Sequence, residues 1–387
     1  MTTLTLPKSD GSLEKFTLRA PPTWSHPTGP FRSRIAFAAA HVVCDPVRDA
    51  DVFSEAPIDW DATLAYRRHL WAYGFSIAEA MDTAQRGGGL TWSAAQDLIA
   101  RAVAESRAPG GGGIACGAGT DHLALSSSLT LEDVENAYAE QVEFVEKHGG
   151  RVILMASRAL ARIARSPDDY ARVYGNILRQ ARVPVILHWL GDMFDPALAG
   201  YWGSSNVDDA MSACLGVINE HWAKVDGIKI SLLDAEREID MRRRLPANVR
   251  MYTGDDFNFA ELIRGDAQGH SDALLGIFDG IAPAASAAFQ ALDRGDMTTY
   301  EKLLAPTVPL SRHIFKKPTF AYKTGIVFLA YLNGHQSHFR MLGGAESART
   351  VVHLAELIRL ADAAGLLDDP ERAAARARVV LQAAGIA

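Results

Sequence analysis

Cysteine is scarce in this sequence, and the three that it has lie far apart. Cys44, Cys116 and Cys214 form no paired spacing, which argues against both a disulfide framework and a cysteine-ligated zinc site. No run reaches the roughly 18 consecutive apolar residues of a membrane-spanning helix, and the charged N-terminal segment lacks the apolar core of a signal peptide. We therefore expect a cytoplasmic protein with no membrane partner.

Clusters of basic residues are also missing. The 39 Lys and Arg are outnumbered by 46 Asp and Glu, a net charge of -7, which argues against nucleic acid as a partner. There is no phosphate-binding lysine loop, no strained serine elbow and no His-Glu-x-x-His motif. Gly117-Ala118-Gly119 lacks the third glycine of a dinucleotide loop. We expect a small-molecule ligand and no dinucleotide cofactor.

What the sequence does have is a long alternation of short apolar runs and amphipathic segments. Its 387 residues are 48% hydrophobic, enough to bury a large core. Strands are predicted over residues 34–40, 75–80, 113–116, 151–155, 183–188, 225–231, 249–252 and 269–277. Helices are predicted between them over residues 61–73, 91–107, 131–148, 167–182, 208–222 and 257–264. This pattern predicts an α/β fold, a (β/α)₈ TIM barrel.

The last hundred residues read as helices only. We predict helices over residues 282–293, 297–315, 319–333, 346–364 and 370–384. The predicted organisation is an irregular or hairpin-like N-terminal lead-in over residues 1–33, the barrel over residues 34–281 and a C-terminal helical extension over residues 282–387.

One lysine lies inside an apolar, β-branched run. Lys229 belongs to Val225-Asp226-Gly227-Ile228-Lys229-Ile230-Ser231, predicted to be a buried strand. Burial disfavours the charged ammonium and leaves a neutral amine that can attack a carbonyl carbon. The alternative is a lysine that reaches water or pairs with Asp226 or Asp234.

Polar residues cluster just after the predicted strands, where the active site of such a barrel lies. They are His41, Asp45, Asp82, Thr83, Gln85, Arg86, Asp121, His122, Ser157, Arg158, His188, Trp189, Asp192, Asp255, Asp256 and His270. Any one of them is more often a loop or capping residue than a catalyst. Convergence of eight strands on one pocket favours a shared function.

The order of several motifs resembles the dihydrodipicolinate synthase and N-acetylneuraminate lyase family of class I aldolase barrels. The tracts that carry the resemblance are Gly74 through Asp82-Thr83-Ala84-Gln85-Arg86, Pro184 to Trp189 followed by Gly227-Ile228-Lys229, Gly254-Asp255-Asp256, Gly265 to Ser271, Arg294-Gly295-Asp296 and Pro318 to Lys323. The match spans roughly residues 34–342. The resemblance implies the barrel fold and a Schiff base at Lys229.

The sequence also departs from the family at two positions. Ser157 or Arg158 stands where the family has its proton-relay tyrosine, and Ala84 replaces the second threonine that helps to hold a keto acid. A different acid–base group and a different substrate are therefore expected.

Three functions fit the residues. The first is a lyase, aldolase or dehydratase without a cofactor, acting on a small polar oxo compound such as a keto acid, sugar acid or keto sugar in carbohydrate or keto acid metabolism. Its catalytic residues are Lys229 and His188 or Asp255, with His41 as a further acid–base candidate. Its substrate-binding residues are Thr83, Arg86, Arg158, His41, Asp256 and His270.

The second function is that of a metal-dependent barrel enzyme. Its divalent metal would be held by His41, Asp121, His122, His188, Asp255 and His270. The third is a non-catalytic ligand-binding barrel. For any of the three we expect a homo-oligomer, a dimer or a tetramer, because Val351, Leu354, Ile358, Val379 and Val380 form apolar stripes on the last helices.

Overall fold

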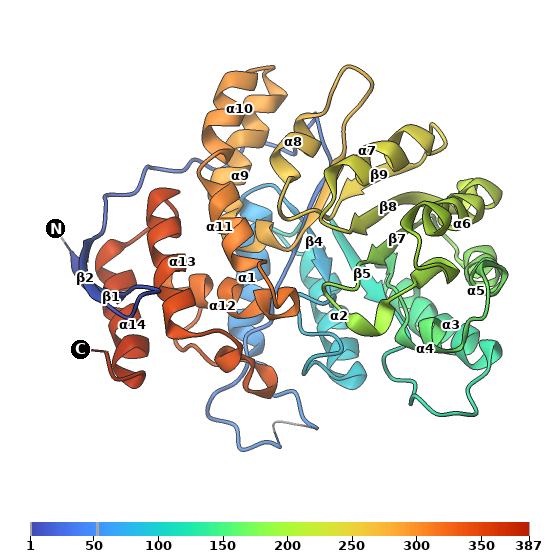
Figure 1. Cartoon of the computed structure of the whole chain (residues 1–387), viewed down its shortest axis with the longest axis horizontal. Helices are drawn as coiled ribbons and strands as arrows, with labels where there is room; N and C mark the ends of the chain where they lie inside the picture. Colours follow the sequence, from blue (N-terminus) through green and yellow to red (C-terminus); the bar gives the residue numbers. More distant parts are fainter. Residues whose placement is uncertain (1, 52–53, 387) are drawn as a thin grey trace.

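The computed structural model describes residues 2–51 and 54–386, and it forms a closed barrel of eight parallel strands (Figure 1). The strands follow each other around the barrel in chain order, and the last closes on the first. The barrel strands are β3 (Ala36–Ala39), β4 (Ser76–Glu79), β5 (Ile114–Ala118), β6 (Arg151–Leu154), β7 (Val185–Leu190), β8 (Val225–Ser231), β9 (Arg250–Thr253) and β10 (Asp272–Leu275). The predicted (β/α)₈ fold is confirmed.

Helices cover the outside of the barrel. They are α1 (Trp60–Ala72), α2 (Trp92–Ser106), α3 (Leu131–His148), α4 (Arg158–Ile163), α5 (Pro167–Gln180), α6 (Val207–Glu220), α7 (Ala235–Arg244), α8 (Phe259–Arg264) and α9 (Ile277–Asp293). Of these, α4 and α7 were not predicted. The sequence of α7 offers little hydrophobic periodicity because it is mostly charged, and α4 has only six residues.

The C-terminal helices gather on one side of the barrel, coloured orange to red in Figure 1. They are α10 (Met297–Leu304), α11 (Thr307–Ile314), α12 (Tyr322–Leu332), α13 (Val351–Ala363) and α14 (Pro370–Ala383). The single helix predicted over residues 297–315 is therefore wrong, since the chain breaks at Ala305-Pro306. The predicted boundary after residue 281 falls inside α9, the helix that follows the last barrel strand.

The N-terminal lead-in is a β-hairpin that lies against the last two helices. Strands β1 (Thr3–Pro7) and β2 (Leu13–Thr17) pair antiparallel. Arg359 of α13 donates hydrogen bonds to Glu14 and to the Pro7 carbonyl, at 2.8 and 3.1 Å. The two ends of the chain are thus packed together (Figure 1).

Among the described residues there are also short 3₁₀ segments. They are η1 (Pro196–Leu198), η2 (Tyr201–Gly203), η3 (Trp222–Lys224), η4 (Thr319–Ala321) and η5 (Leu342–Ala348). Three of them, η1, η4 and η5, reach the barrel mouth. The barrel interior is filled by small and medium side chains such as Ala39, Ala78 and Ile186, which leaves the carboxyl ends of the strands for polar groups.

Candidate active site

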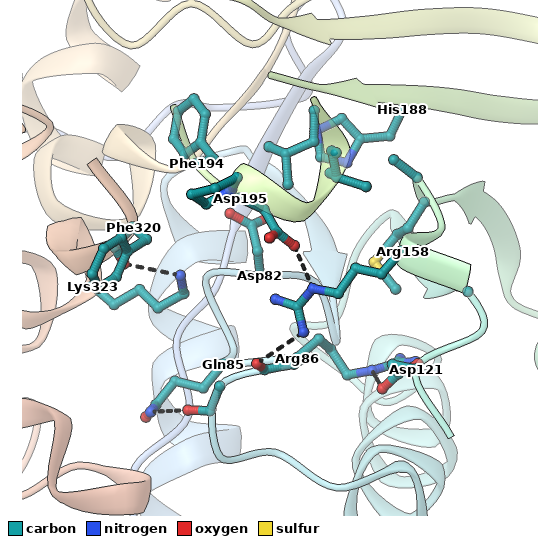
Figure 2. Close-up of a pocket in the computed structure, with 18 of the residues that line it drawn as sticks. Asp82, Gln85, Arg86, Asp121, Arg158, His188, Phe194, Asp195, Phe320 and Lys323 are labelled. Carbon is teal, nitrogen blue, oxygen red and sulfur yellow. Dashed lines mark hydrogen bonds and ion pairs between the residues drawn. The ribbon is translucent and has the colours of Figure 1, made fainter. Parts of the chain in front are cut away.

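A cavity of about 500 Å³ opens at the carboxyl ends of the strands (Figure 2). The loops after β4, β5, β6 and β7 form most of its wall. The rest comes from the C-terminal region, where residues 320–324 and residues 345 and 348 close one side. Because this is the end of a barrel at which active sites lie, the cavity is the candidate site.

Lys229 lies just beneath the floor of this cavity. It pairs in register with His188 on β7 and with Tyr252 on β9, so its side chain points into the barrel with theirs. The residue is 4% exposed, and burial lowers the pKa of its amine although Asp82 and Asp256 oppose that shift. Lys229 itself does not line the cavity, whereas its neighbours Asp82 and His188 do.

Asp82 lies at the centre of the site (Figure 2). Burial acts to raise the pKa of its carboxyl, but attraction from Lys229 and Lys323 and a hydrogen bond from Tyr322 outweigh this and lower the pKa to about 2. The Tyr322 hydroxyl donates to Asp82 Oδ2 at 2.6 Å and is 2.8 Å from the Thr83 hydroxyl. Asp82 is thus an anion between two amines.

The second amine belongs to Lys323, in the first turn of α12. It lines the cavity, and Figure 2 shows its amine pointing toward Asp82. The amine donates to the Phe320 carbonyl at 3.3 Å and lies 4.6 Å from the centre of the Tyr322 ring. Burial lowers the pKa of Lys323, with Asp82 opposing. This lysine is a second candidate nucleophile.

His188 is the histidine that the structure brings to the site. Burial and repulsion from Lys229 lower its pKa well below 6.5, so its imidazole is neutral near pH 7 and can accept a proton. Its Nε2 lies 3.3 Å from the Ser231 hydroxyl. Of the predicted acid–base residues, His188 alone lines the cavity.

The two aspartates after β9 have different positions from those predicted. Asp255 accepts hydrogen bonds from the backbone of Phe257 and Asn258, at 2.8 and 3.0 Å, and shapes the turn before α8. Asp256 is the one that interacts electrostatically with Lys229, and burial raises its pKa to about 8. The prediction of Asp255 as catalytic therefore needs correction, because its carboxylate is committed to a turn.

Both predicted arginines lie at the cavity, and each has an acidic partner. Arg86 forms an ion pair with Asp121 and donates to Gln141 at 2.8 Å. Arg158 pairs with Asp195, as the dashed line in Figure 2 shows. Arg86 is buried and held by these partners, whereas Arg158 binds Asp195 through Nε alone and its side chain is 45% exposed.

Two predicted substrate-binding histidines lie elsewhere. His41 is 1% exposed, and its backbone N–H donates to Asp279 of α9 at 2.7 Å while its ring lies 2.9 Å from the same carboxylate. His270 is exposed and precedes β10, so it lies at the opposite end of the barrel. Neither residue lines the cavity.

The predicted metal set is not assembled. His122 contacts Trp92, Gln141 and Glu140, far from the networks that hold His41 and Asp255. Within residues 2–51 and 54–386, no group of three His, Cys, Asp or Glu side chains could hold a metal ion. That prediction is wrong because these side chains are committed to separate interactions.

Of the two residues predicted at the position of the family tyrosine, Arg158 lines the cavity and Ser157 has a structural role. The Ser157 hydroxyl is 2.7 Å from the Thr120 hydroxyl and accepts from the Leu160 N–H at 2.9 Å, capping α4. Tyr322 reaches the site from the opposite side. Tyr322 and Lys323 are the site residues to which the sequence assigned no function, and Asp82 was predicted only as one of the polar residues after the strands. The only sequence signal was the adjacent Tyr322-Lys323 pair in the helical tail.

These features define the class of protein: a (β/α)₈ barrel with a buried lysine at the carboxyl end of its sixth strand. Solved structures with the same fold include dihydrodipicolinate synthase from Thermotoga maritima, with a TM-score of 0.63 and 13% identity, covering 86% of this chain and 99% of that one. Dihydrodipicolinate synthase DapA-2 from Bacillus anthracis has a TM-score of 0.60 and 15% identity, covering 85% and 98%.

A third is YagE, a prophage protein of the dihydrodipicolinic acid synthase family from E. coli K12, solved in complex with pyruvate. It has a TM-score of 0.63 and 12% identity, covering 92% of this chain and 99% of that one. The resemblance to this family is confirmed at the level of fold. By sequence, the chain belongs to the family described as "Protein of unknown function (DUF993)", which matches residues 4–386.

No curated protein matches the chain. In the part of the chain that the structure describes, every helix is too short or too polar to span a bilayer.

Proposed function

We propose that this protein is a Schiff-base lyase of the class I aldolase kind, acting on an oxo compound through Lys229. The observation that carries the proposal is the position of Lys229: it is buried on the sixth barrel strand, its pKa is lowered by burial, and Asp82 lies near it at the cavity. Structures of the same fold support it, and one of them is a complex with pyruvate.

The chemistry proceeds in two stages. The neutral Lys229 amine attacks the substrate carbonyl to give a carbinolamine, which loses water to form a protonated imine. In a lyase or aldolase, that cation then accepts the electron pair of the neighbouring carbon–carbon bond as the bond breaks. In a dehydratase it accepts the electron pair of a neighbouring carbon–hydrogen bond, and the resulting enamine expels the hydroxyl group, which takes up a proton and leaves as water. Hydrolysis of the resulting enamine, after protonation, returns the lysine.

Three side chains are assigned to support these steps. The ionised Asp82 stabilises the positive charge of the imine. His188 is neutral and lines the cavity, so it accepts the proton released in bond cleavage. Asp256, with a pKa raised to about 8, is protonated near neutral pH and donates to the departing hydroxyl of the carbinolamine.

The test is reductive trapping with borohydride. The protein is incubated with pyruvate, hydroxypyruvate, dihydroxyacetone or 4-phenylbutan-2-one, reduced, digested and examined by mass spectrometry. We expect a stable mass addition on the peptide that contains Lys229. Lys229→Arg should abolish it because a guanidinium stays protonated, and the matched control Lys323→Arg should retain it.

Two results would contradict the proposal. Addition on Lys323 in place of Lys229 would make α12 the source of the nucleophile. Binding of these compounds without any addition would favour a non-catalytic, ligand-binding barrel.

A further inference from the structure

The wall of the cavity restricts the charge, polarity and size of the substrate more than Lys229 does. This inference rests on the proposed function, because it concerns the compound whose carbonyl group reaches Lys229. Three features of the wall bear on it: how its charges are paired, which side chains form its outer part, and how large the cavity is.

The three cationic side chains of the wall, Arg86, Arg158 and Lys323, are matched in number by three acidic ones, Asp82, Asp121 and Asp195. Arg86 pairs with Asp121 and Arg158 with Asp195. The Lys323 amine lies within the electrostatic influence of Asp82. A substrate carboxylate would lie among these three acids and compete with them for the same cations, so the free energy lost by removing it from water would be only partly recovered.

The outer wall of the cavity is apolar. It includes Leu123, Leu125, Phe194, Pro196, Leu198 and Phe320. Leu125 and Phe320 are 47% and 53% exposed. These two residues offer apolar surface that a ligand would remove from water.

The volume of the cavity exceeds what a small oxo acid needs. At roughly 30 Å³ for each water molecule, its 500 Å³ correspond to about sixteen waters. Pyruvate, with six non-hydrogen atoms, would leave most of this space to solvent against an apolar wall. Cavities of this size typically hold ligands several times larger.

We propose that the substrate is an uncharged aldehyde or ketone that carries an aromatic or branched apolar group. Its carbonyl carbon lies toward Lys229, and its apolar group lies against Leu125 and Phe320. This replaces the expectation of a small polar oxo compound, because the polar floor of the site is satisfied internally and the outer wall is apolar.

The test uses four compounds that differ in two features only. They are 4-phenylbutan-2-one, 2-oxo-4-phenylbutanoate, butan-2-one and 2-oxobutanoate, which combine a phenyl group or none with a methyl group or a carboxylate. Binding to Lys229→Met is measured by ligand-observed NMR titration, so that imine formation does not contribute. We expect 4-phenylbutan-2-one to bind on the order of 30-fold more tightly than butan-2-one and at least about 10-fold more tightly than its carboxylate counterpart.

Variants of the wall complete the experiment. Leu125→Asp and Phe320→Ala should each reduce the preference for the phenyl compounds, by about 10-fold when combined. The matched control is Leu13→Asp, at an equally exposed leucine of the hairpin, which should leave the preference unchanged. An equal or greater affinity for the two carboxylates, an unaltered preference in the wall variants, or no binding of any compound would overturn the inference.

The proposed function and this inference can fail separately. Borohydride labelling of Lys229 in the unmodified protein with the same four compounds reports only on the imine. If Lys229 is labelled but the phenyl compounds and the methyl ketones do not bind more tightly, only the proposed substrate class is contradicted. If the compounds bind with the expected preference but Lys229 is not labelled, only the proposed Schiff base is contradicted.

Discussion

Asp82 interacts electrostatically with the amines of both Lys229 and Lys323, and its charge influences the pH at which each amine becomes neutral. The carboxylate raises the pKa of Lys229 and of Lys323 by attraction, while burial lowers both. Asp82, on the loop after β4, is therefore the acidic residue that acts on both lysines, with Asp256 acting on Lys229 and Asp195 on Lys323.

The first prediction concerns Asp82→Asn. Without the carboxylate the pKa of Lys229 falls further, so the neutral amine persists to lower pH. The midpoint of the pH dependence of imine formation should move down by on the order of one pH unit, whereas the maximal extent should decrease because the imine cation loses its counter-ion. Borohydride-trapped label is measured against pH by mass spectrometry.

The control for this prediction is Asp195→Asn. Asp195 pairs with Arg158 and is not among the charges that act on Lys229. Its substitution should leave the midpoint in place. An unmoved midpoint in Asp82→Asn would show that Asp82 does not set the pKa of the nucleophile.

A second residue-scale prediction concerns Glu238 of α7. Burial raises the pKa of its carboxyl from 4.5 to about 8, so the folded chain holds the proton more tightly than the unfolded chain. Its contribution to stability is complete below pH 4.5 and is lost as pH rises to about 8. Glu238→Gln cannot ionise and should unfold at the same temperature as the unmodified protein at pH 4.5, yet at least about 2 °C higher at pH 8.5.

Scanning calorimetry at the two pH values measures this difference. Glu236→Gln, an exposed position on the same helix, is the control and should show no such pH dependence. Equal melting temperatures of Glu238→Gln and the unmodified protein at pH 8.5 would mean that burial does not raise the pKa of Glu238.

The sequence predicted the site residues that lie on strands better than those that come from the tail. Lys229 and His188 were predicted because they interrupt or end apolar runs, and a local pattern is sufficient to find them. The contact between Tyr322 and Asp82 joins residues 240 positions apart. No local pattern specifies it, because it depends on how the helical tail lies on the barrel.

At the scale of elements, the eight barrel strands were predicted with ends within a few residues, because each is a short apolar run between breakers. The direction of the His41 side chain cannot be predicted in this way. It follows β3 as predicted, but the chain turns after the strand, and its ring packs against Tyr66 of α1 with centroids 4.4 Å apart. Position in sequence places a residue at a strand end, and the turn decides which way it faces.

The loop that carries Asp82 is anchored to helix α1 by a buried ion pair. Arg67 donates to both carboxylate oxygens of Glu79 at 2.9 and 2.8 Å, and both side chains are fully buried. Ala80, with a φ of 52°, and Gln85, with a φ of 66°, bracket the Asp82 turn in the left-handed region. The ion pair thus holds β4 where this strained turn begins.

The third prediction tests that anchor. Glu79→Gln leaves the buried guanidinium without a counter-charge and should lower the free energy of unfolding by about 3–5 kcal/mol. Urea denaturation measures the change. The control is Glu105→Gln, which removes the exposed pair of Arg68 on the same helix and should cost less than about 1 kcal/mol.

A double variant separates charge from packing. Arg67→Met with Glu79→Leu removes both charges and should recover most of the stability that Glu79→Gln loses. Similar losses in Glu79→Gln and Glu105→Gln would show that the buried pair does not anchor the loop.

At the scale of the whole molecule, the apolar stripes of the last helices mostly belong to the chain's own core. Leu354 and Ile358 of α13 are 4% and 1% exposed, whereas Val379 of α14 is 60% exposed. The predicted homo-oligomer therefore has its remaining support in the outer face of α14.

The fourth prediction is a dimer or tetramer in solution that depends on that face. Sedimentation velocity at micromolar concentration should show it, and Val379→Glu should shift the protein toward monomer because a charge would be buried at the interface. The control is Val183→Glu, at an exposed valine outside α14. A pure monomer of the unmodified protein contradicts the prediction.

The contact between the hairpin and the last helices also determines when the hairpin can reach its folded position during synthesis. Glu14 emerges from the ribosome near the start, and its partner Arg359 is made 345 residues later. At about 5–20 residues per second, the hairpin waits for tens of seconds with Leu4 and Leu6 uncovered. A chain without α13 and α14 would leave Leu4 and Leu6 exposed to solvent, so the hairpin depends for its burial on helices that are made more than 300 residues later.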